Sequence, residues 1–298
     1  MVKYKVTYIS ISYGRVTSLM WVYLNGEIIP ADEAKISPLD RSFTFGDGVY
    51  EVIPSYNQKL FLFEEHLQRL KISLAKTFIP APSELDNLED ILKKLHVKNK
   101  YHNQSFYIQI TRGVQELRSH TASENIIPTL FINSQNLDIN PYRGNANKEG
   151  LRVRLEDDIR WQRCDIKTTA LIGNILSMHD PSIETVDEVL LHKDGILNEG
   201  SKSNVFLVKQ GKVYTPSLNQ NILPGVTRNF IISLLKKNNI EVFEEEISVD
   251  SIYECEELWL TSSTKEIQPV AFIDDYKIPT KKTEQLIWTK ALKFFNPY

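Results

Sequence analysis

Lys167 has the sequence surroundings of a possible nucleophile. It comes directly before a largely apolar segment, residues 170–176. Removing an ammonium group from water costs free energy unless the group is paired or loses its proton. Such a lysine can be a snorkelling side chain at a helix start, or it can be kept partly neutral so that its amine attacks a carbonyl. The second interpretation requires other groups that would hold a carbonyl compound.

Two segments could bind an anion such as a phosphate group. Pro224 and Gly225 lead directly into a predicted helix, so free backbone amides at residues 225–227 would point out of its N-terminus. The hydroxyl of Thr227 could add a further hydrogen bond. Three hydroxyl residues also follow a predicted apolar strand, namely Ser262, Ser263 and Thr264. Taken alone, the first segment is also typical of an ordinary helix start, and the second of a helix cap.

Further charged residues could complete a ligand site. Arg69 lies on a predicted helix, residues 64–78. Arg118 and His120 are separated by one residue, so in an extended segment they would project the same way and could grip one carboxylate. Glu199 precedes a glycine and a hydroxyl-rich turn, where its carboxylate could bond to a protonated ring nitrogen. Each of these residues alone is also typical of an ordinary surface.

Pyridoxal 5′-phosphate is one cofactor that would use these groups together. Its aldehyde suits Lys167, its phosphate suits the helix start at Gly225, and its pyridinium suits Glu199. The six histidines are scattered, and neither HExxH nor CxxC occurs, so no metal site is expected. The sequence therefore predicts an enzyme that uses this cofactor and no metal.

Eight ordered motifs are similar to those of one enzyme family. In chain order they are FGDGVYEV, EHLQRL, QITRG, RSH, DDIRWQRCDIK, NEGSKSNVF, ILPGVTR and TSSTKEIQPV. From about Met20 to the C-terminus the chain resembles the class IV, fold type IV aminotransferases, which depend on pyridoxal phosphate. Within that class it is most similar to the bacterial D-amino-acid (D-alanine) aminotransferases. One departure is GVQEL before the RSH motif, in place of a proline-containing turn.

The resemblance implies a cofactor role for each matching residue. Lys167 would form the Schiff base with the cofactor and shuttle a proton. Glu199 would pair with the pyridine nitrogen. The other implied cofactor contacts are Arg69, Ser203, Asn204, Leu223, Gly225, Val226, Thr227, Ser262, Ser263 and Thr264.

The resemblance also implies the substrate contacts and the reaction. Tyr50 and Val52 would lie beside the substrate, and Arg118 and His120 would bind its α-carboxylate from the neighbouring subunit of a homodimer. The enzyme would transfer the amino group of D-alanine or a similar D-amino acid to 2-oxoglutarate or pyruvate. Three activities of the same fold stay open as alternatives: a branched-chain L-aminotransferase, an (R)-amine transaminase and an aminodeoxychorismate lyase.

Composition excludes other classes of partner. The 298 residues carry a net charge of −3, and no basic stripe interleaved with aromatic residues suggests nucleic-acid binding. No apolar run approaches the roughly 18 residues of a membrane-spanning helix. Cys164 and Cys255 are too few for a disulfide framework, so we expect reduced, structural cysteines in a cytoplasmic protein.

The pattern of elements predicts two α+β domains with mostly antiparallel sheets and flanking helices. Apolar residues at helical spacing predict helices near residues 64–78 and 84–97, and Asn25-Gly26 predicts a hairpin turn. We expect a smaller N-terminal α/β domain over 20–138, a linker over 139–147 and a larger cofactor-binding domain over 148–298. Residues 1–19 would be an N-terminal extension, and Met20 is a possible true start.

Overall fold

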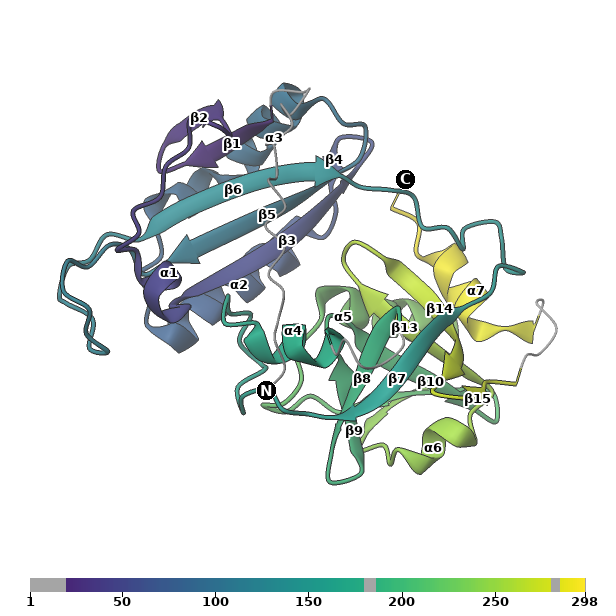
Figure 1. The fold of residues 1–298 in the computed structure, drawn as a ribbon. Helices are drawn as coiled ribbons and strands as arrows, with labels where there is room; N and C mark the ends of the chain where they lie inside the picture. Colours follow the sequence, from purple (N-terminus) through teal and green to yellow (C-terminus); the bar gives the residue numbers. More distant parts are fainter. Residues whose placement is uncertain (1–19, 180–185, 280–284, 298) are drawn as a thin grey trace, which may run out of the picture.

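Two β-sheets with flanking helices make up the molecule (Figure 1). The computed structural model describes residues 20–179, 186–279 and 285–297. The predicted α+β class with mostly antiparallel sheets is confirmed. The extension over residues 1–19, and with it the hypothesis of a start at Met20, falls outside the described residues.

The first sheet has six strands in the order β2-β1-β6-β5-β3-β4, and all of its pairs are antiparallel. The strands are β1 (Trp21–Leu24), β2 (Glu27–Pro30), β3 (Gly48–Tyr56), β4 (Lys59–Leu60), β5 (Gln104–Thr111) and β6 (Thr129–Asn136). The predicted turn at Asn25-Gly26 joins β1 to β2, and both residues have positive φ, as a type I′ hairpin requires.

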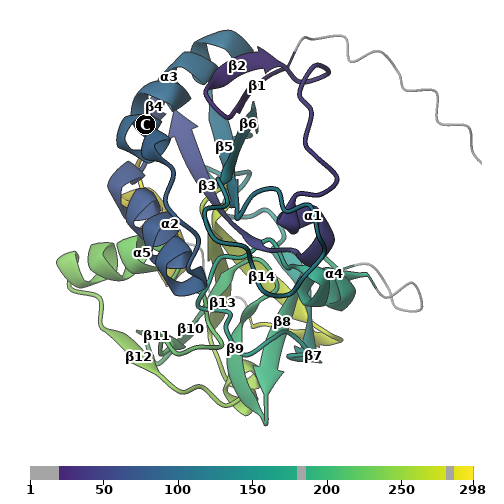
Figure 2. The ribbon, with the colours of Figure 1, turned by 90° about the vertical axis from the view of Figure 1, so that its left-hand side faces the viewer.

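Two long helices cover one face of this sheet (Figure 2). The helical elements are α1 (Arg41–Phe45), α2 (Phe63–Thr77), the 3₁₀ turn η1 (Ser83–Asn87) and α3 (Leu88–Asn99). Leu70 and Leu74 of α2 and Leu92 of α3 are almost fully buried and belong to one core with Phe106 of β5. The helical spacing in the sequence thus identified the buried face correctly.

The second sheet has nine strands, with β12-β11-β10-β13-β14-β7-β8-β9 as its main path and β15 paired to β14. They are β7 (Leu151–Asp157), β8 (Glu188–Lys193), β9 (Ile196–Gly200), β10 (Asn204–Lys209), β11 (Lys212–Pro216), β12 (Val242–Glu245), β13 (Glu257–Ser262), β14 (Glu266–Ile273) and β15 (Tyr276–Lys277). Three pairs are parallel, β11–β12, β14–β7 and β7–β8, and the others are antiparallel.

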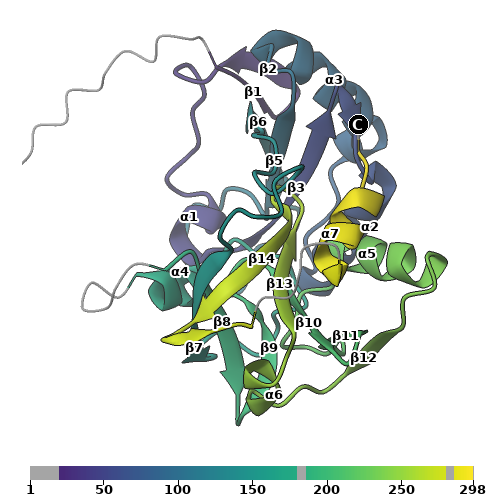
Figure 3. The same cartoon turned by 90° about the vertical axis from the view of Figure 1, so that its right-hand side faces the viewer.

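Both faces of the second sheet are covered. Helices α5 (Val226–Lys237) and α7 (Ile287–Phe294) lie side by side and share a core with Phe206 and Trp259 (Figure 3). Helix α6 (Asp250–Tyr253) lies over a second core that contains Ile252. None of the helices in the described ranges is long and apolar enough to cross a bilayer.

The segment between the sheets is attached to the second one. The Asn140 side-chain amide donates to the carbonyls of Lys265 (2.9 Å) and Ile267 (2.8 Å), and Tyr142 belongs to the α5–α7 core. The predicted linker over 139–147 is therefore packed against β14. The domain limits at 138 and 148 stay a prediction.

The apolar segment after Lys167 forms α4 (Ile172–Met178), as its composition indicated. Several of its apolar side chains are nevertheless accessible within the single chain. Ile172, Ile175 and Leu176 are 67%, 50% and 55% exposed. The short helix lies at the surface, and Ile175 also lines the cavity described below.

Candidate active site

One cavity of about 790 Å³ receives side chains from both halves of the chain. All fourteen residues predicted to contact the cofactor, or the substrate within one subunit, line it. They are Tyr50, Val52, Arg69, Lys167, Glu199, Ser203, Asn204, Leu223, Gly225, Val226, Thr227, Ser262, Ser263 and Thr264. Their individual roles stay predictions, but the fold brings them to one place.

Lys167 combines a fixed backbone with a side chain that lines the cavity. Its carbonyl accepts from the Tyr50 amide (2.9 Å), and its amide donates to the Ser73 hydroxyl (3.3 Å). Its Nζ lies 4.1 Å from the centre of the Tyr50 ring. The amine is thus held at the boundary between the two halves, over an aromatic face that stabilises a cation.

Glu199 lies buried at another part of the cavity wall. Its carboxylate accepts from the Arg160 guanidinium (2.7 Å), the Asn204 amide group (3.1 Å) and the backbone amide of Leu223 (3.1 Å). Burial raises the pKa of the Glu199 carboxyl to about 7, although Arg160 and the Leu223 amide act in the opposite direction. Glu199 is therefore an acceptor whose charge state depends on its neighbours.

Arg160 is a cavity residue to which the sequence analysis gave no role. Asp158 holds it through two hydrogen bonds, to Nε (2.9 Å) and to Nη2 (2.8 Å), and Asn198 donates to Asp158 in turn (2.9 Å). Hydrogen bonds thus connect Asn198 to Asp158, Asp158 to Arg160 and Arg160 to Glu199. The motif DDIRWQRCDIK contained this arginine, but its approach to Glu199 depends on a contact 39 residues away.

Arg69 is fixed by a buried carboxylate that the sequence analysis also left without a role. Glu51 accepts from Arg69 at 2.9 Å and 2.6 Å and from His66 at 3.1 Å. Burial works to raise the pKa of Glu51, but Arg69 and His66 outweigh it and hold that pKa well below its usual value. Arg69 also donates to the carbonyl of Pro224 (3.2 Å), so it connects α2 to the start of α5.

The start of α5 offers backbone amides to the cavity. Gly225 is its N-cap residue, and no side chain caps this end. A Cβ at position 225 would lie 1.9 Å from Oδ1 of Asn204, so only glycine leaves room for that side chain. The predicted hydroxyl run begins at Ser262, the last residue of β13, and continues into the turn to β14, so the alternative that it caps a helix is wrong.

The donor set fits a phosphate-bearing cofactor with an aldehyde and a basic ring nitrogen. The Thr261 hydroxyl lines the cavity and is buried without a hydrogen-bond partner in the described part of the chain. Together with the uncapped amides of α5 and the Arg69 guanidinium, it provides donors for an anion. Lys167 and Glu199 complete the set with an amine and an acceptor.

Another buried acid shapes the turn that follows β9. Glu188 accepts from the hydroxyls of Ser201 and Ser203, the latter at 3.0 Å, and it lines the cavity. Ser203 therefore faces Glu188 as well as the cavity. Because Glu188 stands in a different strand from this turn, sequence spacing gave no signal for the contact.

Arg118 and His120 do not line the cavity of their own chain. Both are exposed on the connection between β5 and β6, where they contact the ring of Phe45. The guanidinium carbon of Arg118 lies 4.4 Å from the centre of that ring, and the His120 ring lies 5.4 Å from it. Their predicted approach from a neighbouring subunit stays a prediction.

Both cysteines are buried free thiols. Cys164 lines the cavity, but burial raises its pKa to about 12, and its Sγ donates to the Trp161 carbonyl (3.1 Å). Burial also raises the pKa of Cys255 to about 12. Neither thiol is disposed to act as a nucleophile. Across the described ranges, no group of three or more His, Cys, Asp or Glu residues is arranged to hold a metal ion.

Comparison with known proteins agrees with this geometry. Residues 48–273 match the family model described as amino-transferase class IV. A D-alanine aminotransferase of Listeria monocytogenes is 35% identical over 263 residues, which cover 88% of this chain and 91% of that protein. A D-alanine aminotransferase of Staphylococcus haemolyticus is 34% identical over 278 residues, which cover 93% of this chain and 97% of that protein.

Solved structures share the architecture. The branched-chain aminotransferase of the archaeon Thermoproteus uzoniensis has a TM-score of 0.81 and 23% identity, and the match covers 92% of this chain and 93% of that one. Another branched-chain amino acid aminotransferase, solved with pyridoxamine 5′-phosphate, has a TM-score of 0.83. Below 25% identity such likeness establishes the fold alone. With the family match and the two relatives, it shows that the chain belongs to the class IV aminotransferases, enzymes that depend on pyridoxal 5′-phosphate.

Proposed function

We propose that this enzyme transfers the amino group of D-alanine, or of a similar D-amino acid, to a 2-oxo acid such as 2-oxoglutarate or pyruvate. The names of the relatives at 34–35% identity support this choice of substrate. The observation that carries the proposal is the cavity that brings together the amine of Lys167, the buried acid Glu199 and the anion donors at Arg69 and α5.

The cavity residues divide the work of this reaction. Pyridoxal phosphate, when bound, supplies an electron sink for the charge that develops at the substrate α-carbon. Lys167 would attach the cofactor through Nζ and then accept and return the α-proton at the same atom. Arg69 and the α5 amides would hold the phosphate. An ionised Glu199 would hold the proton on the ring nitrogen, with Arg160 favouring its charged state.

Recognition of the substrate carboxylate would come from a second subunit. Arg118 and His120 project from the surface next to Phe45, outside their own cavity. Helix α4 has exposed apolar side chains, of which Ile175 also lines the cavity, and such exposed apolar side chains suit a protein interface. A homodimer in which each subunit supplies these two residues to the other cavity accounts for both features.

The choice of enantiomer follows from where the carboxylate is held. The α-hydrogen must face Lys167, and with that atom fixed, exchanging the enantiomers exchanges the side chain and the carboxylate. Arg118 and His120 would fix the carboxylate on one side and thereby select one hand.

A cytoplasmic location is also proposed, and the two buried free thiols are compatible with a reducing compartment.

An amino-donor panel of paired enantiomers tests the substrate proposal. Purified holoenzyme is assayed with D- and L-alanine, D- and L-leucine and (R)-1-phenylethylamine, with 2-oxoglutarate as acceptor. D-Alanine should give the highest kcat/KM. A preference for L-leucine would establish the branched-chain alternative, and a preference for the amine would establish the (R)-amine transaminase.

Borohydride reduction followed by peptide mapping tests the role of Lys167. The pyridoxyl label should appear on the peptide that contains Lys167, and Lys167→Ala should lose both the label and turnover. A label on another lysine would contradict the assignment.

A further inference from the structure

The residues 115–123, named here the carboxylate loop, carry Arg118 and His120 between β5 and β6. A pair of side chains that must grip a carboxylate in one orientation needs a fixed backbone, because small misplacements weaken such contacts strongly. Both side chains are exposed in the single chain. The question is therefore what holds the main chain beneath them.

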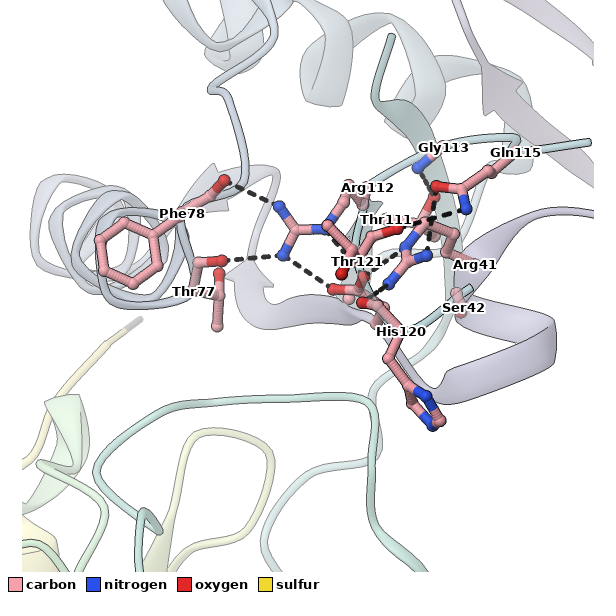
Figure 4. A network of polar contacts seen from close by, with 12 residues as sticks. Arg41, Ser42, Thr77, Phe78, Thr111, Arg112, Gly113, Gln115, His120 and Thr121 are labelled. Carbon is pink, nitrogen blue, oxygen red and sulfur yellow. Dashed lines mark hydrogen bonds and ion pairs between the residues drawn. The ribbon is translucent and has the colours of Figure 1, made fainter. Parts of the chain in front are cut away.

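Arg41, the first residue of α1, is buried beneath the loop and bonds to its main chain (Figure 4). Its Nη1 donates to the Ser119 carbonyl (2.7 Å), and its Nη2 donates to the His120 carbonyl (3.1 Å). Ser119 is the residue between the two proposed carboxylate ligands. The guanidinium thus binds the backbone at the pair itself.

Arg41 is itself held from behind by a carboxylate. Its Nε donates to Asp47 (2.7 Å), and Arg112 donates to the same carboxylate at 2.8 Å and 3.0 Å. The other hydrogen bonds of Arg112 go to the carbonyls of Thr77 (2.9 Å) and Phe78 (2.8 Å) at the end of α2, not to the loop. The two arginines share Asp47, but Arg41 bonds to the carboxylate loop and Arg112 bonds to the end of α2.

The other end of α1 contacts the side chains of the pair. The Phe45 ring meets the guanidinium of Arg118 and the ring of His120. The guanidinium carbon of Arg41 lies 4.8 Å from the centre of the same ring. Helix α1 therefore supports the loop twice, through the main chain at Arg41 and through the side chains at Phe45.

Gln115 closes the loop on itself. Its Oε1 accepts from Arg41 (3.2 Å) and from the amide of Ser123 (3.0 Å), and its Nε2 donates to the Leu117 carbonyl (2.8 Å). These bonds join the two ends of the loop to its middle and to Arg41.

We propose that Arg41, through its bonds to the Ser119 and His120 carbonyls, is the positioning residue that aims Arg118 and His120 at the substrate carboxylate. This inference rests on the proposed function of that pair. Arg41 does not touch the cavity, so its effect would fall on substrate recognition and not on the cofactor.

Arg41→Lys and Arg112→Lys form a matched pair for the test. Each keeps a positive charge beside Asp47, but a lysine at 41 cannot make the forked contact to the loop. With holoenzyme, Arg41→Lys should raise the KM for D-alanine about tenfold and change kcat less than about threefold. Its cofactor Kd should stay at the wild-type value, and Arg112→Lys should leave KM within about twofold.

Arg118→Ala separates failure of this inference from failure of the proposed function. If Arg118→Ala raises KM and Arg41→Lys does not, the positioning role is wrong and the carboxylate role stands. If Arg118→Ala leaves KM unchanged, the carboxylate role fails and the inference fails with it. When both single variants raise KM, the double variant should be little worse than Arg118→Ala alone, and fully additive effects would overturn the inference.

Gln115→Ala keeps the proposal testable if Arg41→Lys does not fold. It removes one anchor of the loop from a partly exposed position. We expect a smaller rise in KM with unchanged cofactor affinity. An unchanged KM, or a rise accompanied by loss of cofactor, would count against the positioning role.

Discussion

Glu199 shows how one buried residue depends on several others. Its carboxyl has a pKa raised to about 7 by burial, while the Arg160 guanidinium at 2.7 Å favours the ionised form. Asp158 in turn fixes Arg160. A protonated ring nitrogen can be held well only by the ionised carboxylate, so the strength of this contact should follow the charge of Glu199.

Cofactor affinity should therefore depend on Glu199 most strongly above neutral pH. The wild-type carboxyl is charged above its pKa of about 7, so near pH 8 the substitution removes a charge. Glu199→Gln should therefore raise the Kd of the apoprotein for pyridoxal phosphate about tenfold near pH 8. Below about pH 6 the wild-type carboxyl is protonated, and the two proteins should differ less than about threefold. Spectroscopic titration at each pH gives the ratio.

The control is Glu241→Gln, which alters an exposed acid paired with Lys212. Its ratio to wild type should stay flat with pH. A ratio for Glu199→Gln that does not change with pH would disprove the dependence on the charge of this carboxyl.

At the scale of elements, α5 and the turn before it approach β10 very closely. The Asn204 side chain fills the space where a Cβ of residue 225 would lie, and its amide also donates to the Leu223 carbonyl (3.0 Å). The position of the helix start thus depends on the absence of a Cβ at residue 225. The proposed phosphate donors belong to that same helix start.

Gly225→Ala should displace the start of α5, since the new Cβ would clash with Asn204. The Kd for the cofactor should rise about tenfold or more. Gly211→Ala is the comparison variant. This variant replaces a glycine with positive φ in the β10–β11 hairpin, where an added Cβ would have no atom within 4 Å. It should lower stability by about 1 kcal/mol and leave cofactor binding unchanged. Equal cofactor affinities for both variants would contradict the role of the α5 start.

The buried pair of Glu51 and Arg69 connects β3 to α2. Because the pKa of Glu51 is lowered in the folded state, the stability that it supplies is fully present above its unfolded value of about 4.5 and is lost as the pH falls below it. Glu51→Gln should cost roughly 3 kcal/mol near neutral pH, since it removes the charge partner of a buried arginine.

Urea unfolding between about pH 3 and pH 7 tests this contribution. The wild-type free energy of unfolding should fall more steeply toward low pH than that of Glu51→Gln. Glu89→Gln, which alters an exposed pair with Lys93, should keep the wild-type slope. Parallel curves for Glu51→Gln and wild type would show that the pair does not supply acid-sensitive stability.

At the scale of the whole molecule, one chain completes the proposed cofactor site but not the proposed carboxylate site. Lys167 and the phosphate donors share a cavity, while Arg118 and His120 lie outside it. In a two-fold symmetric dimer each subunit would supply to its neighbour what it receives. This arrangement can be tested by combining two defective subunits.

Lys167→Ala and Arg118→Ala should each be nearly inactive at low D-alanine concentration, and their co-expression should restore activity. In a mixed dimer, one cavity has the Lys167 of its own chain and the intact Arg118 of the other. Equal expression should recover about a quarter of the wild-type rate, because half of the dimers are mixed and each has one complete site. No recovery in isolated mixed dimers would mean that both residues act within one chain.

Local patterns in the sequence determined the helices, the hairpin turns and the residue types of the site. The leucines of α2 and α3 repeat with the helical period, so the buried face follows from spacing alone. Asn25-Gly26 tolerates positive φ, so its turn follows from two residues. Fourteen of the residues that the motifs named line one cavity, but the motifs did not indicate their hydrogen-bond partners.

Only the tertiary structure decided which groups meet. Glu51 and Arg69 are 18 residues apart in the sequence, and Arg160 and Glu199 are 39 residues apart. Arg41 bonds to a carbonyl of the carboxylate loop that lies 79 residues away. No local preference encodes such contacts, because they depend on strand order and on how the two halves pack together. The same packing left Arg118 and His120 outside the cavity and the apolar side of α4 exposed, which periodicity could not have indicated.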